Sequence, residues 1–226
     1  MRRFLAPLLF GFACILCHGA DAPVPVQQEP MHRPVFENDY VRIIDVQIPP
    51  GKNTLYHIHV IPSVVVYLTK ATNRSQTWGE TTFLNRHVSP GESRYAPYDE
   101  KSLTHQVTNT GATLFRVFDI ELLRPAPAVA PSPTSLSAPA VRQWTEKRVA
   151  AARVPLAANQ RCAFAPDACA HLLIGISGAV NASADARHPE IHRTLKNADY
   201  VFLPPQTAFE LRSEGAAAEA LVLELH

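Results

Sequence analysis

Gly51-Lys52-Asn53-Thr54-Leu55-Tyr56-His57-Ile58-His59 is the stretch from which the rest of the chain can be interpreted. Side chains alternate between the two faces of a β-strand, so histidines two positions apart point to the same side. Two imidazoles on one face can bind the same metal ion. The stretch therefore predicts a glycine turn followed by a strand that carries a pair of metal ligands.

A third ligand must come from another strand, and His105 is the candidate. It lies in Leu103-Thr104-His105-Gln106-Val107-Thr108-Asn109, which again has the alternation of a strand. We therefore predict that His57, His59 and His105 converge on one ion. The alternative, in which these histidines only pack against their neighbours, stays open.

These residues resemble the two sequence motifs of the cupin superfamily, which forms RmlC-like jelly-roll barrels. The first motif is a glycine, five residues, His-x-His and then a glutamate; Gly51, His57 and His59 match its first part. The second motif is a proline region, a histidine, three residues and an asparagine. Its matches are Pro90, Gly91, Pro97, His105 and Asn109, with a longer Pro97–His105 stretch than usual. The resemblance covers roughly residues 35–122 and, more faintly, 144–226.

The chain departs from the family where the glutamate falls on Ser63 or Val64. The resemblance then implies a three-histidine site, as in cupins that act as thiol or diketone-cleaving dioxygenases with a non-haem iron. Iron is the expected cofactor for an enzyme, and zinc, manganese, nickel or copper also suit imidazole ligands. An ion whose charge is not compensated favours a small anionic or chelating ligand. Tyr67 is a candidate pocket residue, and Ser63 is either near the metal or an ordinary turn serine.

Three functions remain open at this point. The chain is a metal-dependent oxygenase, a non-catalytic module that binds a metal or a small ligand, or a structural protein without chemistry. No obvious general acid or base lies beside the histidines in the sequence, which favours binding or O₂ chemistry over hydrolysis.

A Pro/Ala-rich linker at residues 125–143 divides the chain into two halves that align with each other. At one constant offset Val41, Val46 and Ile48 match Val149, Val154 and Leu156. We therefore predict an all-β chain of two tandem cupin-type double-stranded β-helix barrels, a metal-binding domain at 35–124 and a degenerate domain at 144–226. Helix formers within 142–158 offer a local helical alternative, which we set aside because the repeat predicts a strand.

The second half lacks the ligand set, since Ala165, Asp167 and Phe209 stand where the first half has its histidines. Cys162 and Cys169 bracket this segment, and an even pair in an exported chain predicts a disulfide; two buried free thiols are the alternative. The remaining histidines are expected to be exposed or incidental. They are His32, His87, His171, His188, His192 and His226.

The N-terminus predicts a cleaved signal peptide at residues 1–20, followed by an extension at 21–34. Arg2 and Arg3 precede an apolar run that is too short to span a bilayer comfortably. The protein is then periplasmic or secreted and has no stable membrane insertion after cleavage; a buried first strand or an uncleaved anchor stays open. The formal net charge of +1 offers no surface for nucleic acid. We expect a small-molecule partner and either a monomer or a homodimer.

Overall fold

The structure, a computed structural model, describes residues 22–129 and 134–226. Within these ranges every regular element is a β-strand except one short 3-10 turn, η1 (Val26–Gln28). None of the described residues forms a helix long and apolar enough to cross a bilayer. The all-β prediction is therefore confirmed, whereas the predicted signal peptide lies outside the described residues.

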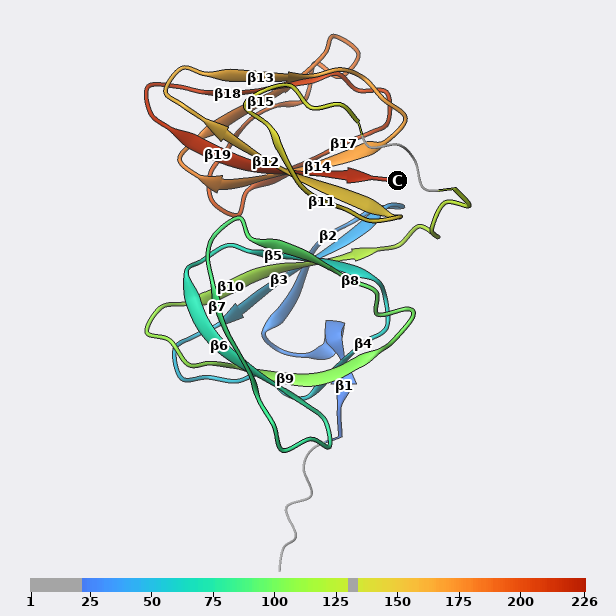
Figure 1. Ribbon diagram of the computed structural model, residues 1–226, viewed down its shortest axis with the longest axis vertical. Coiled ribbons are helices and arrows are strands. Elements are labelled where there is room, and N and C mark those ends of the chain that lie inside the picture. Colours follow the sequence, from blue (N-terminus) through green and yellow to red (C-terminus); the bar gives the residue numbers. More distant parts are fainter. Residues whose placement is uncertain (1–21, 130–133) are drawn as a thin grey trace, which may run out of the picture.

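The first barrel consists of two five-stranded sheets that face each other (Figure 1). Sheet A contains, in spatial order, β1 (Val24–Pro25), β4 (His57–His59), β9 (Leu103–Asn109), β6 (Ala71–Thr77) and β7 (Leu84–Val88). Sheet B contains β2 (His32–Glu37), β3 (Val41–Ile48), β10 (Phe115–Leu122), β5 (Ser63–Tyr67) and β8 (Ser93–Ala96). Val46, Tyr67 and Val117 belong to the apolar cluster inside this barrel.

The turn that leads into β4 depends on Gly51 and Asn109. Gly51 has a φ of +71°, a left-handed conformation that glycine adopts without strain. Its N–H donates to the Asn109 carbonyl at 3.0 Å. The Asn109 side-chain amide in turn donates to the carbonyls of Ile48 and Thr113, each at 2.8 Å. The glycine and the asparagine of the two motifs thus hold the same turn in place.

The second barrel repeats the arrangement with a five-stranded and a four-stranded sheet. Sheet C contains β11 (Val141–Thr145), β12 (Val149–Leu156), β19 (Ala218–Leu225), β14 (Ala170–Ser177) and β17 (Tyr200–Leu203). Sheet D contains β13 (Arg161–Phe164), β18 (Phe209–Ser213), β15 (Val180–Ala184) and β16 (His192–Leu195). β12 takes the place in sheet C that β3 takes in sheet B. Residues 142–158 contain most of β11 and all of β12 and no helix, so the helical alternative is wrong.

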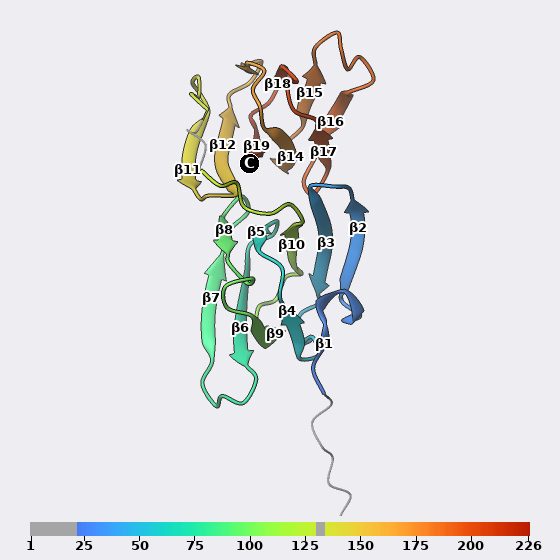
Figure 2. The same ribbon diagram turned by 90° about the vertical axis from the view of Figure 1, so that its right-hand side faces the viewer.

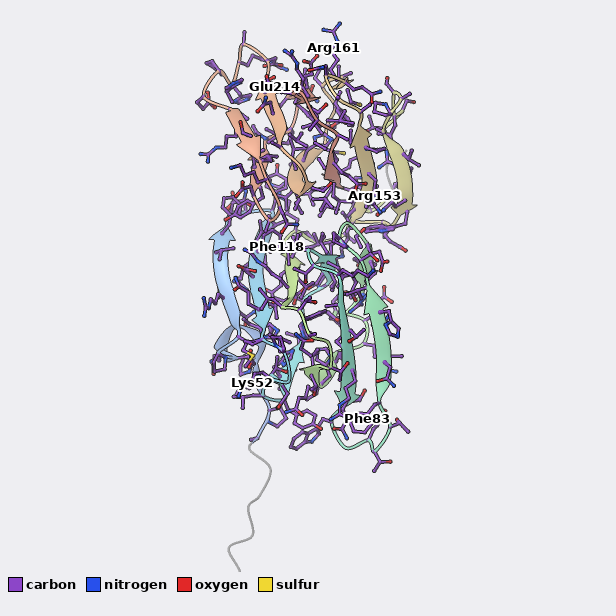
Figure 3. The ribbon with its side chains drawn as sticks, turned by 90° about the vertical axis from the view of Figure 1, so that its left-hand side faces the viewer. Lys52, Phe83, Phe118, Arg153, Arg161 and Glu214 are labelled. Carbon is purple, nitrogen blue, oxygen red and sulfur yellow. The ribbon has the colours of Figure 1, made fainter. Side chains whose placement is uncertain are left out.

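Sheets B and C pack back to back, so both faces of their central strands are buried (Figure 2). Val64 and Val66 of β5 join residues of the second barrel in one apolar cluster, whereas Val65 faces the interior of the first barrel. Phe118 lies at the junction of the two halves (Figure 3). This packing explains the continuous apolar runs, because a strand that is buried on both faces has no need for polar positions.

The predicted linker is partly built into the second barrel. Leu136 and Ala140 pack against the apolar cluster inside that barrel, and β11 begins at Val141. Arg142 Nη2 donates to the Thr134 carbonyl at 2.9 Å. The second half of this segment therefore follows the barrel surface, while residues 130–133 lie outside the described ranges.

The predicted disulfide between Cys162 and Cys169 is not formed, since both cysteines are free. Cys162 lies on β13 of sheet D and is buried in the apolar cluster of the second barrel. Cys169 directly precedes β14 of sheet C, and its Sγ lies 3.9 Å from Glu224 Oε1. Proximity in the sequence suggested the bond, but the two residues enter different sheets.

Candidate metal centre

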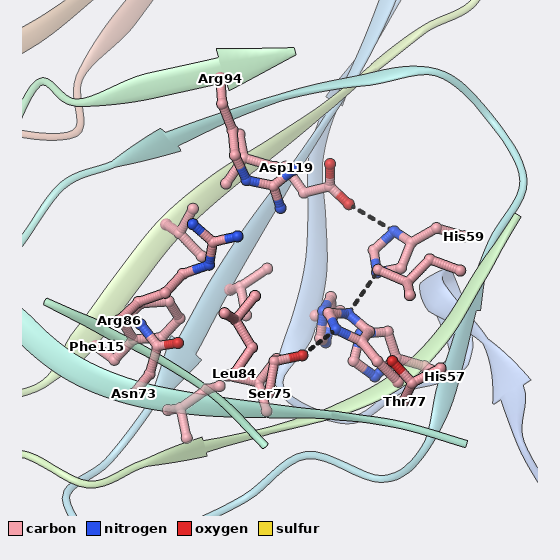
Figure 4. Close-up of a pocket in the computed structure, with 18 of the residues that line it drawn as sticks. His57, His59, Asn73, Ser75, Thr77, Leu84, Arg86, Arg94, Phe115 and Asp119 are labelled. Carbon is pink, nitrogen blue, oxygen red and sulfur yellow. Dashed lines mark hydrogen bonds and ion pairs between the residues drawn. The ribbon is translucent and has the colours of Figure 1, made fainter. Parts of the chain in front are cut away.

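The three predicted histidines meet at one end of the first barrel. His57 and His59 lie on the same face of β4, and His57 is the cross-strand partner of His105 on the antiparallel strand β9. The three ring centroids are 4.6 to 5.1 Å apart, and all three side chains are buried. Strand parity and pairing therefore bring the imidazoles together, as Figure 4 shows for His57 and His59.

His32 joins this group, so the expectation that it is exposed or incidental is wrong. It is 6% exposed, and its ring centroid lies 4.4 Å from that of His57. Ligand atoms of His32, His57 and His59 all lie within 4.8 Å of one another, and the predicted ligand His105 is not in this group, although its Nε2 lies 3.2 Å from that of His59. His32 pairs with Val46 across β2 and β3, and cross-strand partners face the same side of a sheet. No family motif covers His32. Its pairing with this inward-facing valine is the feature that places it in the site.

The Nδ1 atom of each of the four rings already has a partner. His57 Nδ1 donates to the Leu55 carbonyl at 2.9 Å, and His105 Nδ1 lies 2.8 Å from Ser75 Oγ. Two carboxylates serve the other rings. His32 Nδ1 is hydrogen-bonded to Glu29 Oε2 at 2.5 Å. His59 Nδ1 lies 3.1 Å from Asp119 Oδ2, which is an ion-pair distance without hydrogen-bond alignment (Figure 4). Such partners fix the tautomer of a histidine and orient its Nε2 for a metal.

The Nε2 atoms of His57, His59 and His105 have no protein partner that suits them. His57 Nε2 is buried without a hydrogen bond, and His59 Nε2 lies 3.2 Å from His105 Nε2. When Nδ1 carries the proton, each Nε2 presents a lone pair, and two lone pairs at this distance repel each other. A cation between the rings removes both problems, so the donor set fits a divalent transition metal.

His57 and His105 are also in the protonation state that binds a metal. Burial, followed by the charges of His32 and His59, lowers the pKa of His57 to about 3. Burial likewise holds the pKa of His105 well below its usual value, helped by His57 and His59. Both rings are therefore neutral at pH 7, and no proton has to leave before an ion binds.

Asp119 is the functional residue that sequence reasoning missed most clearly. It lies on β10, 4% exposed, beside His59. Burial would raise its pKa, but the contact with His59 outweighs burial and the pKa is lowered, so the carboxylate is charged. The expectation that no acid or base lies beside the site is therefore wrong. Ser63 donates to the Ile61 carbonyl at 3.1 Å, which is a turn contact.

A cavity of about 350 Å³ extends from the histidines between sheets A and B. Tyr67, the candidate pocket residue, lines it together with Arg94 and Tyr98, and the Tyr98 ring stacks on His59 at 4.8 Å. The walls are largely aliphatic or aromatic, formed by Val46, Ile48, Val65, Leu84, Leu103, Val107, Phe115 and Val117. The cavity can therefore hold a small molecule against the histidines.

The second barrel has no such centre at the aligned positions. Phe209 stands opposite Phe164, and the two rings stack at 4.4 Å inside the apolar cluster. A different group, Cys169, Glu224 and His226, does place ligand atoms within 4.8 Å of one another. Burial, with the charges of Glu224 and Asp167, raises the pKa of Cys169 to about 12, so its thiol is protonated when no cation is bound.

Comparison with known proteins gives matches only among solved structures. No family model matches the chain, and no curated protein matches it. A cupin 2 conserved barrel domain protein from Leptotrichia buccalis matches with a TM-score of 0.53 at 8% identity, over 86% of this chain and 88% of that one. Protein Ylba from E. coli matches with 0.62 at 10% identity, over 91% and 87%.

The chain has the cupin fold. A variant of salicylate 1,2-dioxygenase from Pseudoaminobacter salicylatoxidans, in complex with gentisate, has the same fold, with a TM-score of 0.63 at 11% identity over 89% of this chain and 76% of that one. Identities this low show the fold alone. What this chain does must therefore be argued from its own histidines and cavity.

Proposed function

We propose that the first barrel binds a divalent transition metal through His57, His59 and His105, with His32 beside them, and acts as an oxygenase on a small anionic or chelating compound. The observation that carries the proposal is the orientation of the rings. The Nδ1 atoms of His32, His57 and His105 are hydrogen-bonded to the protein, and that of His59 lies beside the Asp119 carboxylate. His57, His59 and His105 turn Nε2 atoms without suitable partners toward one another.

The chain's own residues would hold and protect the site. Glu29 and Asp119 keep two imidazoles in the binding tautomer, and the walls of the cavity exclude bulk water from the compound. When bound, an iron(II) ion supplies a Lewis-acidic centre that is also redox-active. The fold shared with a dioxygenase that is seen in complex with gentisate supports a small-molecule ligand.

Metal analysis of the purified full chain tests the proposal. We expect about one ion per chain in the wild type and loss of this ion in His105→Ala, because an imidazole is removed from the ligand set. His87→Ala is the matched control, since His87 is exposed on β7. Metal content that is the same in all three proteins would contradict the proposal.

Oxygen uptake by the iron-loaded chain separates the two functions that a metal allows. Uptake with gentisate, catechol or a related chelating compound, absent in His105→Ala, would support an oxygenase. Tight metal and ligand binding without uptake would instead support a non-catalytic binding module. The tautomers set by Glu29 and Asp119 serve either function.

We further propose that the chain is exported, on the basis of the apolar run that follows Arg2 and Arg3. The mass of the protein recovered from outside the cytoplasm should correspond to a chain that begins near Asp21. Recovery of the full-length chain from the cytoplasm would contradict export without affecting the metal site.

A further inference from the structure

The cavity has two chemically different ends, which Figure 4 displays. The histidines lie at one end, and Asn73 and Arg86 lie away from them, whereas Arg94 reaches in beside Asp119, with its Nη2 3.5 Å from the hydroxyl of Tyr98. Asn73, Arg86 and Arg94 come from three strands, β6, β7 and β8, that belong to both sheets of the barrel. The fold thus adds hydrogen-bond donors to the cavity beyond the candidate metal ligands.

Arg94 is a cation without an anion. Its Nε is buried and has no hydrogen-bond partner, and none of the ion pairs among the described residues includes it. Its Nη2 lies 3.5 Å from the Tyr98 hydroxyl, which is a long contact with a neutral group. Arg94 as a whole is half-buried, and a charge that is partly withdrawn from water gains from an anionic partner.

Asn73 adds a second unsatisfied donor. It is 4% exposed, and its Nδ2 has no hydrogen-bond partner. Arg86, its cross-strand partner on β7, also lines the cavity. Buried amide groups are rarely left without a partner in folded proteins, so each such group calls for an explanation.

The charge balance of the cavity favours an anion. Arg86 and Arg94 are always protonated, and a divalent ion at the histidines would add to their charge. Two carboxylate residues line the cavity as well: Asp119, which lies against His59, and the exposed Glu80. A planar guanidinium with a free edge binds a carboxylate through two parallel hydrogen bonds.

We propose that Arg94 and Asn73 bind the carboxylate of a compact ligand whose other end carries the oxygen donors that reach the metal. The middle of the ligand would lie against Val65, Phe115 and Val117, which favours an aromatic or branched carbon frame. This inference rests on the proposed function and names the substrate class and the specificity residues of the same site.

Two probe compounds that differ only in the carboxylate test the inference. 3,4-Dihydroxybenzoate carries a chelating pair of hydroxyls and a carboxylate on opposite sides of one ring, and catechol lacks the carboxylate. Binding of each to the zinc-loaded full chain is measured by calorimetry, because zinc is not redox-active. We expect the carboxylate to tighten binding about tenfold or more, the value of a charge-assisted hydrogen bond.

The variant Arg94→Gln should remove this advantage while catechol affinity and zinc content stay unchanged. Arg94→Lys, which keeps the charge but not the planar fork, should retain part of it. Arg161→Gln is the control, since Arg161 is exposed on β13 of the second barrel. If circular dichroism shows that Arg94→Gln does not fold, the test uses Arg94→Lys and Asn73→Ala instead. Each of these variants should reduce the tighter binding that the carboxylate gives.

The inference is overturned if the carboxylate gives no advantage in the wild type, if the advantage persists in Arg94→Gln, or if zinc-loaded protein binds neither compound. Each of these results leaves the metal site standing. A wild-type chain that holds no zinc would instead contradict the proposed function, so the two failures can be told apart.

Discussion

The two barrels share one arrangement of strands but fill their interiors differently. In the first barrel β4 and β9 turn His57, His59 and His105 inward beside a cavity. In the second barrel the stacked rings of Phe164 and Phe209 occupy the corresponding interior and belong to its apolar cluster. The same framework therefore supports either a site or a solid core.

The proposed function therefore depends on which side chains the strands turn inward and not on the arrangement of the strands. Both barrels use the same central strands, β3 with β10 and β12 with β19, and sheets B and C bury one apolar cluster between them. The framework does not depend on the histidines. Imidazoles packed around a cavity give up the burial of apolar side chains, so we expect the first barrel to gain stability from a metal that the second does not need.

The largest expected effect is the loss of metal from a changed ligand. His57→Ala should weaken metal binding by more than about 100-fold, since losing a ligand costs more than losing an outer partner. Ala165→Ser changes the aligned position of the second barrel and should leave affinity unchanged. Competition with a coloured chelator measures both. Equal affinity in His57→Ala and the wild type would remove the functional contrast between the barrels.

The reverse contrast should appear in stability. Phe209→Ala should lower the free energy of unfolding by about 3–5 kcal/mol, because it opens a cavity in a packed core. His105→Ala, at the aligned position, should destabilise the metal-free protein less, since its ring borders a cavity already. Urea unfolding of metal-free samples gives both values. Similar losses of unfolding free energy in the two variants would mean that the histidines stabilise the first barrel as packed core residues.

The carboxylates behind the histidines should have a smaller effect. Asp119→Asn and Glu29→Gln keep all four imidazoles but weaken the hold on their Nδ1 atoms, so metal affinity should fall about 10- to 100-fold. Glu37→Gln is the control, because Glu37 is an exposed carboxylate that pairs with Arg42. Unchanged affinity in both buried variants would show that these contacts do not orient the rings.

The smallest effect concerns two carboxylates at matching positions. Burial raises the pKa of Glu121 on β10. On β19, burial acts the same way on Glu224, but the hydrogen bond with His226 and the contacts of Thr134 and Arg142 outweigh it and lower the pKa from 4.5 to about 2.

A lowered pKa contributes stability that is present above the unfolded value and is lost as the pH falls from 4.5 toward 2. For Glu121, with a raised pKa, the sign is opposite: its contribution is present at low pH and is lost as the pH rises through the folded value. Thermal midpoints of the metal-free protein between these pH values should therefore become less acid-sensitive in Glu224→Gln but not in Glu121→Gln. The same pH profile in both variants would contradict the opposite directions of the Glu224 and Glu121 pKa shifts.

The sequence predicts those features that depend on residues close together in the chain or on a pattern that repeats along it. The all-β fold and the strand at residues 149–156 follow from an apolar pattern that recurs at a constant offset. His57 and His59 share a face because they lie two apart on one strand, and His105 stands at the spacing of a family motif. These inferences needed only strand geometry and that motif.

The rest depends on contacts between strands that are far apart in the sequence. His32 enters the site through the pairing of β2 with β3, and Asp119 through the position of β10 behind His59. The expected Cys162–Cys169 bond failed for the same reason, because neighbouring positions lead into different sheets. Arg94 can be recognised as unpaired only when all of its neighbours are known.

Anomalous diffraction from crystals of the zinc-loaded protein tests the central claim most directly, since it locates the ion without reference to activity. We predict a peak enclosed by the imidazoles of the first barrel, at bonding distance from His57, His59 and His105. Absence of that peak, or an ion bound only at Cys169, Glu224 and His226, would contradict the account and leave the first barrel with a cavity and no metal centre.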